Sequence, residues 1–429
     1  MSMTLIMFIT FFILIFISVP IGWALGISAV FSMVVTGARD FNLVLMASRM
    51  YNASSSFVLM ALPFFILAGN IMSGGGLSKR LIDFCRSLIG RVHGGLGMAG
   101  ILASAFFAAI SGSNAATTAA VGGMLIPELE NNGYPKELSA ATIAAAGTTG
   151  MVIPPSSSMV VFAATASASL PALFMGGMIP GIMMAVSLMI CIYVIARRMK
   201  IERDKAGEHH ILKTFVKSIP ALMMPIIILG GIYSGIFTAT EAAVVACVYS
   251  IIITVFVFRE LKLKDLPRIL WESAITSAVG IIVITCASMF AYVITKEHIP
   301  EALSNLILSW TDSKFVVLLL FNVILLISGC FITASSAIVI LVPIFLPVLV
   351  SFGIDPVAVG IIMVLNLSIG SITPPVGGNV FIASAIAKVN VEGIFRRILI
   401  FFAVLLVDLA LINGFNDIIL FLPRLLGTY

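Results

Sequence analysis

Charged side chains are scarce in this chain of 429 residues: Asp, Glu, Lys and Arg make up 10% of it, whereas hydrophobic residues make up 60%. A soluble domain has about 25% charged residues, so this shortage excludes an ordinary water-covered surface. The mean hydropathy is +1.18. Apolar runs of about 20 residues recur along the chain, and each can cross a bilayer as a helix. We therefore expect an all-α polytopic membrane protein, because helices satisfy their own backbone groups in lipid.

Residues that often carry covalent or metal chemistry are also few. The five cysteines form no CxxC pair, and no two of the four histidines have the spacing of metal ligands. This scarcity argues against a disulfide framework and against a Cys/His metal site. We expect the cysteines to be buried as small core residues.

Enzyme motifs are missing as well. No GxxxxGK[ST] loop occurs, so the chain does not itself hold ATP in such a loop. No GxGD motif occurs and no histidine lies inside an apolar run, which disfavours an intramembrane hydrolase, the alternative from another functional class. We therefore do not expect an enzyme.

The apolar runs predict nine full spans and two interrupted segments. No Lys or Arg precedes the first run and no small-residue cleavage site follows it, so we expect a retained helix rather than a signal peptide. Residues 95–126 and 314–350 are too long and too interrupted for single helices, and we expect each to fold back as a re-entrant hairpin. The full spans are expected at residues 4–35, 54–74, 138–166, 172–196, 218–236, 239–258, 273–295, 356–388 and 392–413.

The basic residues predict the orientation of these spans. With a cytoplasmic N-terminus and both hairpins re-entrant, all but five of the 24 Lys and Arg residues fall in cytoplasmic segments, as the positive-inside rule requires. The C-terminus is then periplasmic, and the basic clusters report orientation rather than nucleic-acid binding. The five exceptions are Arg39, Arg49, Lys296, Lys314 and Arg424.

The two halves of the chain resemble each other around these hairpins. SGSNAATTAAVGGMLIP (111–127) has a counterpart in SGCFITASSAIVILVP (328–343), and each is followed by a Pro-Pro pair. The charge count makes the hairpins enter from opposite sides, so we expect an inverted repeat, an architecture of secondary transporters. The seam is expected at the charged stretch 197–210.

This repeat suggests a division of the chain into scaffold and moving parts. We expect the hairpins and broken helices to form a transport domain. The segments are scaffold helices with a cytoplasmic amphipathic arm (1–94), the first hairpin and broken helix (95–166), connecting and scaffold helices with a cytoplasmic linker at 197–217 and an arm at 259–272 (167–295), the second hairpin and broken helix (314–388), and the C-terminal helices (389–429).

The Pro-Pro pairs predict breaks within two spans, at Pro154 and at Pro374. Proline lacks the backbone donor that a helix needs and displaces the carbonyl four residues earlier. Unpaired carbonyls are costly in lipid, so the break requires a partner for them. Carbonyl and hydroxyl oxygens at the ends of half-helices suit Na⁺. We therefore predict two sodium sites.

Small hydroxyl, amide and glycine residues cluster at these breaks and at the hairpin tips. Each hairpin tip is expected to face the break of its own half. The first sodium site is expected at Ser111, Gly112, Ser113, Asn114, Thr117, Gly147, Thr149 and Gly150, and the second at Gly329, Thr333, Ser335, Ser336, Gly370 and Thr373.

The second half of each broken helix begins beside the same sites. Its N-terminal N–H groups favour an anion such as a carboxylate. Serine capping of the new helix is a second interpretation of the IPPSSS segment, and both roles are compatible. The residues expected to line a substrate site are Pro154, Pro155, Ser156, Ser157, Pro375, Gly377, Gly378 and Asn379.

Three other polar residues lie within or beside the spans. Glu241 follows Thr238 at capping-box spacing, so a helix start is the favoured interpretation. Asp408 stands in an otherwise apolar span, and packing against a polar group is favoured over a proton relay. Asn366 lies one turn before Gly370, where it can support the second site without binding the ion directly.

Several segments together carry a resemblance to a known family. SGSNAATTAAVGGMLIPELENNGYP, GTTGMVIPPSS, GGIYSGIFTATEAAVV and GSITPPVGGNVFIASAIA resemble the large membrane subunit of tripartite ATP-independent periplasmic (TRAP) transporters along essentially the full chain. The resemblance implies a sodium-coupled importer with an elevator mechanism in a bacterial inner membrane. SGSNAATT is less acidic than its counterpart in some relatives, so no side-chain carboxylate is expected in the first sodium site.

The same resemblance implies partners and a substrate class. The partners are a periplasmic substrate-binding protein and a small four-helix membrane subunit, the latter as a separate chain. The substrate is a small organic acid, with sialic acid slightly preferred to a C4-dicarboxylate. A stand-alone Na⁺- or H⁺-coupled dicarboxylate or citrate carrier is the alternative within transport.

Overall fold

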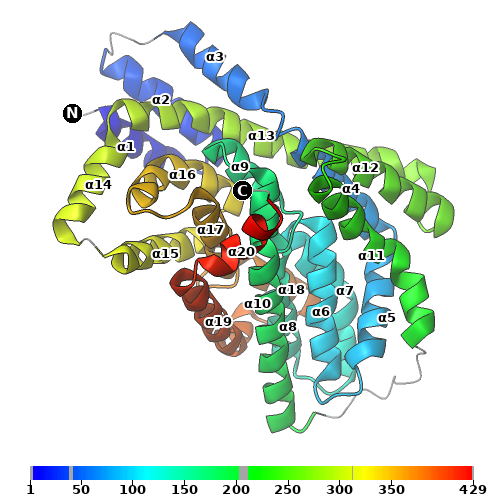
Figure 1. Cartoon of the computed structure of the whole chain (residues 1–429). Coiled ribbons are helices and arrows are strands. Elements are labelled where there is room, and N and C mark those ends of the chain that lie inside the picture. Colours follow the sequence, from blue (N-terminus) through cyan, green and yellow to red (C-terminus); the bar gives the residue numbers. More distant parts are fainter. Residues whose placement is uncertain (1–2, 38–41, 202–210, 312, 428–429) are drawn as a thin grey trace.

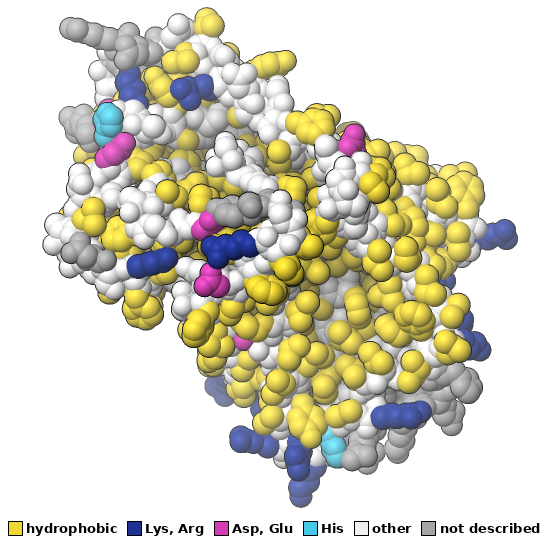
Figure 2. All heavy atoms as spheres, in the orientation of Figure 1, with side chains coloured by type: hydrophobic (Ala, Val, Ile, Leu, Met, Phe, Trp, Pro, Cys, Tyr) yellow, Lys and Arg dark blue, Asp and Glu magenta, His cyan; other side chains and the backbone are white. Residues whose placement is uncertain are grey.

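The chain is helical throughout its described residues, 3–37, 42–201, 211–311 and 313–427, and contains no strand there. In this computed structural model, six helices are long and apolar enough to cross a membrane, or up to eight if each bent helix pair is one span. Figure 2 shows hydrophobic side chains across the central part of one face, with Lys and Arg gathering toward its lower end. Both observations confirm the expected all-α membrane protein.

The described residues of the first half form ten α-helices and one short 3-10 segment. They are α1 Met3–Phe16, α2 Ile21–Val35, α3 Leu43–Ser54, α4 Ala61–Gly74, α5 Leu77–Ile89, α6 Gly95–Ser111, α7 Asn114–Asn131, α8 Lys136–Ala146, the 3-10 segment η1 Gly147–Met151, α9 Ser157–Ala166 and α10 Leu170–Arg198.

The second half has the same number of α-helices among its described residues. They are α11 Ile211–Tyr233, α12 Ala239–Ile251 with a π-helical continuation η2 Ile252–Val257, the 3-10 turn η3 Leu263–Asp265, α13 Leu266–Lys296, α14 Ile299–Trp310, α15 Lys314–Phe331, α16 Ala334–Ser351, α17 Pro356–Gly370, α18 Gly378–Ala387, α19 Val391–Gly414 and α20 Asp417–Leu425.

Both interrupted segments fold back as helix pairs, and both Pro-Pro pairs break a helix, as predicted. Residues 95–126 are the helix pair α6–α7, and residues 314–350 are the pair α15–α16. The span 138–166 is divided into α8 and α9, and the span 356–388 into α17 and α18. The Pro-Pro peptide bond in each break is cis.

The helix pairs that pack together are the same when each helix is replaced by its counterpart from the other half. The helix α2 packs on α13 and α4 packs on α12, while α7 packs on α18 and α16 packs on α9. Swapping each helix for its counterpart, α2 for α12, α4 for α13, α7 for α16 and α9 for α18, returns the same pairs. In Figure 1 the long α13 crosses the top of the molecule, with α1 and α2 toward one end and α4 and α12 toward the other.

The expectation of one helix over residues 4–35 is wrong. Pro20 has no backbone donor, and the chain turns at Ser18, whose φ is +65°. The two resulting helices pack against each other. Each is about 22 Å long, less than the thickness of a hydrocarbon core.

The two short helices run in opposite directions along α13. The Thr4 hydroxyl donates to Glu297 Oε2 (3.5 Å), and the ring of Phe8 meets that of Phe290 edge-on with centroids 5.6 Å apart. A Cβ atom added at Gly22 would lie 3.3 Å from the Val283 Cα atom. The start of α1 therefore lies at the Lys296 end of α13. Because the N-terminus and Lys296 lie at the same end of α13, they lie on the same side of the membrane. The two predictions of a cytoplasmic N-terminus and a non-cytoplasmic Lys296 therefore contradict each other.

Other boundaries also differ from the expectation. The second half of the predicted arm at 259–272 belongs to α13, since Pro267 occupies the first turn of that helix, where its missing donor costs nothing. The helices α3, α14 and α20 were not predicted as separate elements. Part of the linker 197–217, residues 202–210, and Arg39 lie outside the described residues.

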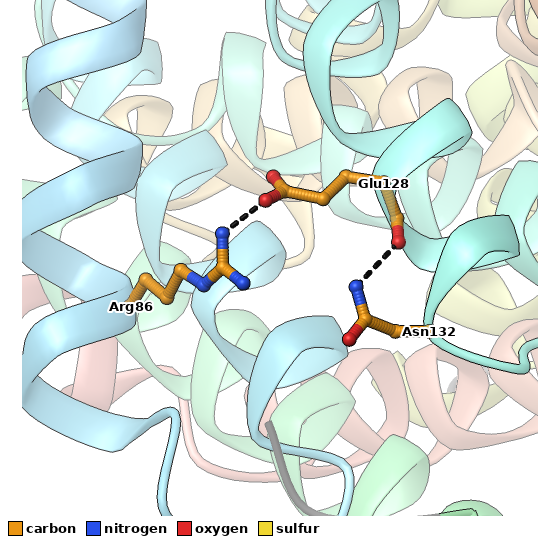
Figure 3. A network of polar contacts seen from close by, with 3 residues as sticks. All are labelled: Arg86, Glu128 and Asn132. Atoms are coloured by element: carbon orange, nitrogen blue, oxygen red, sulfur yellow. Dashed lines mark hydrogen bonds and ion pairs between the residues drawn. The ribbon is translucent and has the colours of Figure 1, made fainter. Parts of the chain in front are cut away.

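The predicted amphipathic arm of the first half is the helix α5, bent by 70° from α4. Its apolar face is buried at Leu77, Leu81 and Cys85, mainly against α6 and α11. Arg80 forms an ion pair with Glu260 (2.6 Å), just after α12. Arg86 pairs with Glu128 of α7 (Figure 3).

Candidate substrate and ion site

The first break lies directly against the first hairpin tip. A Cβ atom added at Gly150 would lie 2.5 Å from the Ser113 carbonyl oxygen, so only glycine allows this approach. The Met151 N–H donates to Asn114 Oδ1 (2.9 Å). After the break, Ser156 caps α9 by accepting from the Met159 N–H (3.4 Å). The predicted contact between tip and break in this half is therefore present, as is the predicted serine cap.

Asn114 also joins the first hairpin to the second break. Its Nδ2 donates to Ser368 Oγ (2.8 Å) and to Ser371 Oγ (3.1 Å) at the end of α17. Ser368 Oγ donates in turn to the Thr148 carbonyl. One amide thus connects three segments that are far apart in sequence, a link that the sequence did not reveal.

The second break lies against the second hairpin tip in the same way. A Cβ atom added at Gly370 would lie 2.7 Å from the Gly329 Cα atom, so the two backbones touch. Cys330 Sγ donates to the Thr373 carbonyl oxygen (3.2 Å). The Thr373 hydroxyl donates to the Ile369 carbonyl of its own helix (3.0 Å).

Both hairpin tips and both breaks meet around one central cavity of about 370 Å³. No charged side chain lines it; its polar lining consists of hydroxyl, amide and backbone groups. The predicted site residues that line it are Ser113, Asn114, Ser157, Gly329, Thr333, Ser335, Gly378 and Asn379. Ser158 of the IPPSSS segment and Ser371 of the second break, both expected at the site, line it as well, whereas Met151 and Cys330 were missed by sequence reasoning.

A neighbouring cavity of about 330 Å³ lies between the hairpin tips and the helices α4 and α13. Ser113, Ser157 and Ser335 line both this cavity and the central one. Ser111 lines only the neighbouring cavity, together with Asn70 and Thr276. The hairpin tips therefore stand between the site and the helices α4 and α13.

Most of the remaining predicted residues are buried behind the cavity wall; Ser111 and Thr373 are half-buried, and Pro375 is exposed. The Gly112 carbonyl accepts from Ser157 Oγ (2.9 Å), and Thr117 Oγ1 bonds Ser111 Oγ (2.9 Å). Ser336 Oγ bonds Thr333 Oγ1 (2.9 Å). The predicted residues absent from the cavity lining are Gly112, Thr117, Gly147, Thr149, Gly150, Pro154, Pro155, Ser156, Ser336, Gly370, Thr373, Pro375 and Gly377, together with Ser111 of the neighbouring cavity.

One buried hydroxyl behind the first break has no hydrogen-bond partner among the described residues: Thr118 Oγ1. A Cβ atom added at Gly147 would overlap this oxygen. Asn379 Nδ2 donates to the Ala144 carbonyl close by (3.2 Å). Thr118 was not predicted, although it follows Asn114 by one helical turn on the same face. An unpaired buried oxygen beside a carbonyl-rich break suits a cation with neutral oxygen ligands.

The other polar residues have structural partners. Glu241 and Thr238 form the predicted capping box at the start of α12. Asp408 accepts from Ser187 Oγ (2.8 Å), which confirms packing against a polar group. Asn366 donates to Asn322 Oδ1 (2.5 Å), away from the cavity. All five cysteines are buried and unbridged, as expected.

Acidic and soft metal ligands do not gather anywhere in the described part of the chain. No group of three or more His, Cys, Asp or Glu side chains there is arranged to hold a metal ion. A cation at the central site would therefore depend on hydroxyl, amide and carbonyl oxygens.

The family model described as "Tripartite ATP-independent periplasmic transporter, DctM component" matches residues 8–418. The C4-dicarboxylate TRAP transporter large permease protein DctM of Pseudomonas aeruginosa is 40% identical over 383 residues, which cover 89% of this chain and 90% of that protein. The sialic acid TRAP transporter large permease protein SiaM of Vibrio cholerae is 33% identical, with 97% of each chain covered.

A solved structure shares the fold. The Alcanivorax borkumensis YdaH transporter superposes with a TM-score of 0.66 at 15% sequence identity, covering 86% of each chain. The sequence relatives are transporter permeases rather than enzymes, and they match along nearly the whole chain. This multi-pass membrane protein therefore belongs to the DctM family, the large permease components of tripartite ATP-independent periplasmic transporters.

Proposed function

We propose that this permease imports a small organic anion together with Na⁺. The observation that carries the proposal is the central cavity, where two hairpin tips and two helix breaks present neutral oxygens and no charged side chain. Coupling has an energetic reason, because an anion entering a negative cell interior works against about 2.3 kcal/mol per charge per 100 mV. Two Na⁺ ions, one in each half, would offset both charges of a dicarboxylate.

The sodium sites are proposed at the two breaks. The prolines remove the donors that would otherwise bond the carbonyls of the preceding turn, including that of Gly150. Asn114 and the unpaired Thr118 hydroxyl lie beside the first break. At the second break, the Thr373 and Gly370 backbone lies against Gly329 and Cys330. Residues behind the cavity wall fit an ion better than a substrate, because an ion needs only a small, closely packed space.

The substrate is proposed to bind in the central cavity through a carboxylate. The N-termini of α9 and α18 meet there, at Ser157 and at Gly378 and Asn379, and helix N-termini attract anions. A volume of about 370 Å³ lies within the usual range for small-molecule sites. The higher identity to the C4-dicarboxylate permease favours a C4-dicarboxylate, with sialic acid second.

An elevator mechanism is proposed for the crossing. The exchange of pairings between the two halves fits an inverted repeat, which supplies two mirror-related states. Helices α2, α4, α12 and α13 would form the fixed scaffold, and the hairpins with the broken helices would move as a block. The cavity beside α4 and α13 marks the boundary between the two parts.

The partners follow from the family. Its large permeases work with a substrate-binding protein and usually with a small membrane subunit. We propose that this chain uses a periplasmic binding protein and a separate small four-helix subunit in a bacterial inner membrane. The proposed orientation has Arg197, Arg268 and Arg396 on the cytoplasmic side, in keeping with the positive-inside rule.

The test is uptake by the reconstituted pair of membrane subunits, supplied with a matched binding protein loaded with labelled succinate. Uptake should require an inward Na⁺ gradient and should stop when choline replaces Na⁺. Persistence of uptake in choline, with a dependence on external pH, would favour the H⁺-coupled carrier instead. Uptake that needs no binding protein would favour the stand-alone carrier.

A further inference from the structure

A second and larger cavity, of about 850 Å³, lies away from the central site. Four elements form it: α3 and the second half of α13 on one side, and the end of α9 with α16 on the other. The α3 and α13 helices pack together, as do α9 and α16. The cavity therefore lies between helices of the proposed scaffold and helices of the proposed transport block, beside the contact of α13 with α16.

The only charged residues in the lining of this cavity are two cations, Arg49 and Lys296. The Arg49 guanidinium lies over the Tyr292 ring at 4.2 Å from its centroid, and the Lys296 ammonium lies 6.0 Å from the same centroid. Tyr292 thus lies next to both cations in the cavity lining, and cations are attracted to the face of an aromatic ring. The polar lining adds hydroxyl and amide donors, among them Asn52 and Ser288.

These two cations are unusual for the chain. Both belong to the five basic residues that the charge distribution leaves outside the cytoplasmic segments. The central cavity, by contrast, has no charged lining residue. A pair of cations facing a water-accessible cavity raises the local concentration of anions.

Two helices connect the two cavities. Ser157 and Ser158 at the start of α9 line the central cavity, whereas Thr165 near its end lines the larger one. Ser158 and Thr165 are seven positions apart, so about 10 Å of helix separates the two cavities. The helix α16 makes the same connection, because Ser335 lines the central cavity and its later turns line the larger one.

We propose that the larger cavity is an entry chamber for the organic anion, in which Arg49 and Lys296 bind its carboxylate before it reaches the central site. The inference rests on the proposed function for the identity of the anion, but the anion-binding property itself can be tested without transport. The chamber would hold the anion weakly, because a tight site would slow its release toward the central cavity.

The first test measures the electrostatic potential of the chamber. Asn52→Cys is reacted with a negatively charged and a positively charged methanethiosulfonate, and the background of the parent protein, whose native cysteines are buried, is subtracted. The ratio of the two rates should favour the anionic reagent. Arg49→Gln together with Lys296→Gln should lower this ratio by at least about fivefold. Ser309→Cys, outside the chamber, should show no such change.

Protection by a ligand completes this test. Millimolar succinate should slow the reaction of Asn52→Cys, and choline at the same concentration should not. A rate ratio that is unchanged by the two neutral substitutions, or equal protection by succinate and choline, would overturn the proposal. Neither measurement requires Na⁺ or uptake, so a failed sodium test of the proposed function would leave this result standing.

The second test asks whether the chamber serves uptake. The double Gln variant should import labelled succinate at least about fivefold more slowly than the parent. The conservative pair Arg49→Lys and Lys296→Arg should restore most of the rate, because it keeps the charge. Lys314→Gln, an exposed lysine outside the chamber, is the matched control. Sodium-dependent uptake at the parent rate in the double Gln variant would reject the entry chamber while leaving the proposed function intact.

Discussion

At the residue scale, the side chain of Asn114 forms three hydrogen bonds between distant segments. Its amide accepts from Met151 and donates to Ser368 and Ser371, so it holds the first break and the second break to the same hairpin tip. Removing a buried amide leaves its hydrogen-bond partners unsatisfied, which costs about 1–3 kcal/mol for each such group. The geometry of both proposed ion sites therefore depends on this one side chain.

Replacing Asn114 should weaken sodium coupling. Asn114→Ala removes the acceptor at Met151 and both donors to the α17 serines, so the Na⁺ concentration for half-maximal uptake should rise about tenfold or more. The measurement is succinate uptake at a series of Na⁺ concentrations. Asn132→Ala, at the far end of the same helix, is the control. A sodium curve that Asn114→Ala does not shift would reject its place in the ion site.

The contact between Gly329 and Gly370 leads to a second prediction at this scale. Gly370→Ala places a methyl group 2.7 Å from the Gly329 backbone, and the two helices must separate to admit it. We expect a loss of about 1–3 kcal/mol in the free energy of unfolding, together with loss of uptake. Gly123→Ala is the control, because nothing lies within 4 Å of its added Cβ atom. Equal stability of the two variants, measured by unfolding in detergent, would contradict the close approach.

At the element scale, the arm helix α5 joins the two parts of the molecule. Arg80 near its start pairs with Glu260 beside α12, and Arg86 further along pairs with Glu128 on the first hairpin. Figure 3 shows the Arg86 and Glu128 side chains pointing toward each other from α5 and α7. An arm attached at both ends can limit how far the hairpin moves against the scaffold.

The Arg86–Glu128 pair should contribute more than a surface ion pair. Its side chains are 15% and 33% exposed, whereas those of the Arg268–Glu272 pair are 75% and 59% exposed. Double-mutant cycles with Gln substitutions should give a coupling energy of about 1 kcal/mol for the first pair and at most about 0.5 kcal/mol for the second. Coupling energies of equal size would mean that the arm is not held to the hairpin by this pair.

The elements that could be predicted from the sequence are those marked by particular residues within the element itself. The Pro-Pro pairs and the Ser-Gly tips mark breaks and turns by the chemistry of the residues themselves, and both breaks and both hairpins were located correctly. The site residues Thr118 and Cys330 were missed because their role comes from packing between distant segments; Cys330 and Thr373, whose carbonyl it contacts, are 43 positions apart. The turn at Pro20 was visible in the sequence, but the long apolar run around it suggested a single helix.

At the scale of the whole molecule, the position of α1 changes the predicted topology. The start of α1 lies beside Glu297, and α2 returns along α13 toward the same end. The orientation of every later segment depends only on where the chain leaves α2. The charge distribution therefore still predicts that Lys296 lies outside and Arg268 inside, and with this packing it predicts an N-terminus on the outer side as well.

This topology can be tested with an impermeant reagent. A tag placed before Met1 and a cysteine at Ser309→Cys should both be labelled from outside intact spheroplasts, because both lie at the Lys296 end of α13. Lys264→Cys, at the opposite end of α13, should be labelled only after permeabilisation. Labelling of the tag only after permeabilisation would place the N-terminus in the cytoplasm. Given the contact between Thr4 and Glu297, that result would also turn Lys296 and the proposed entry chamber toward the cytoplasm.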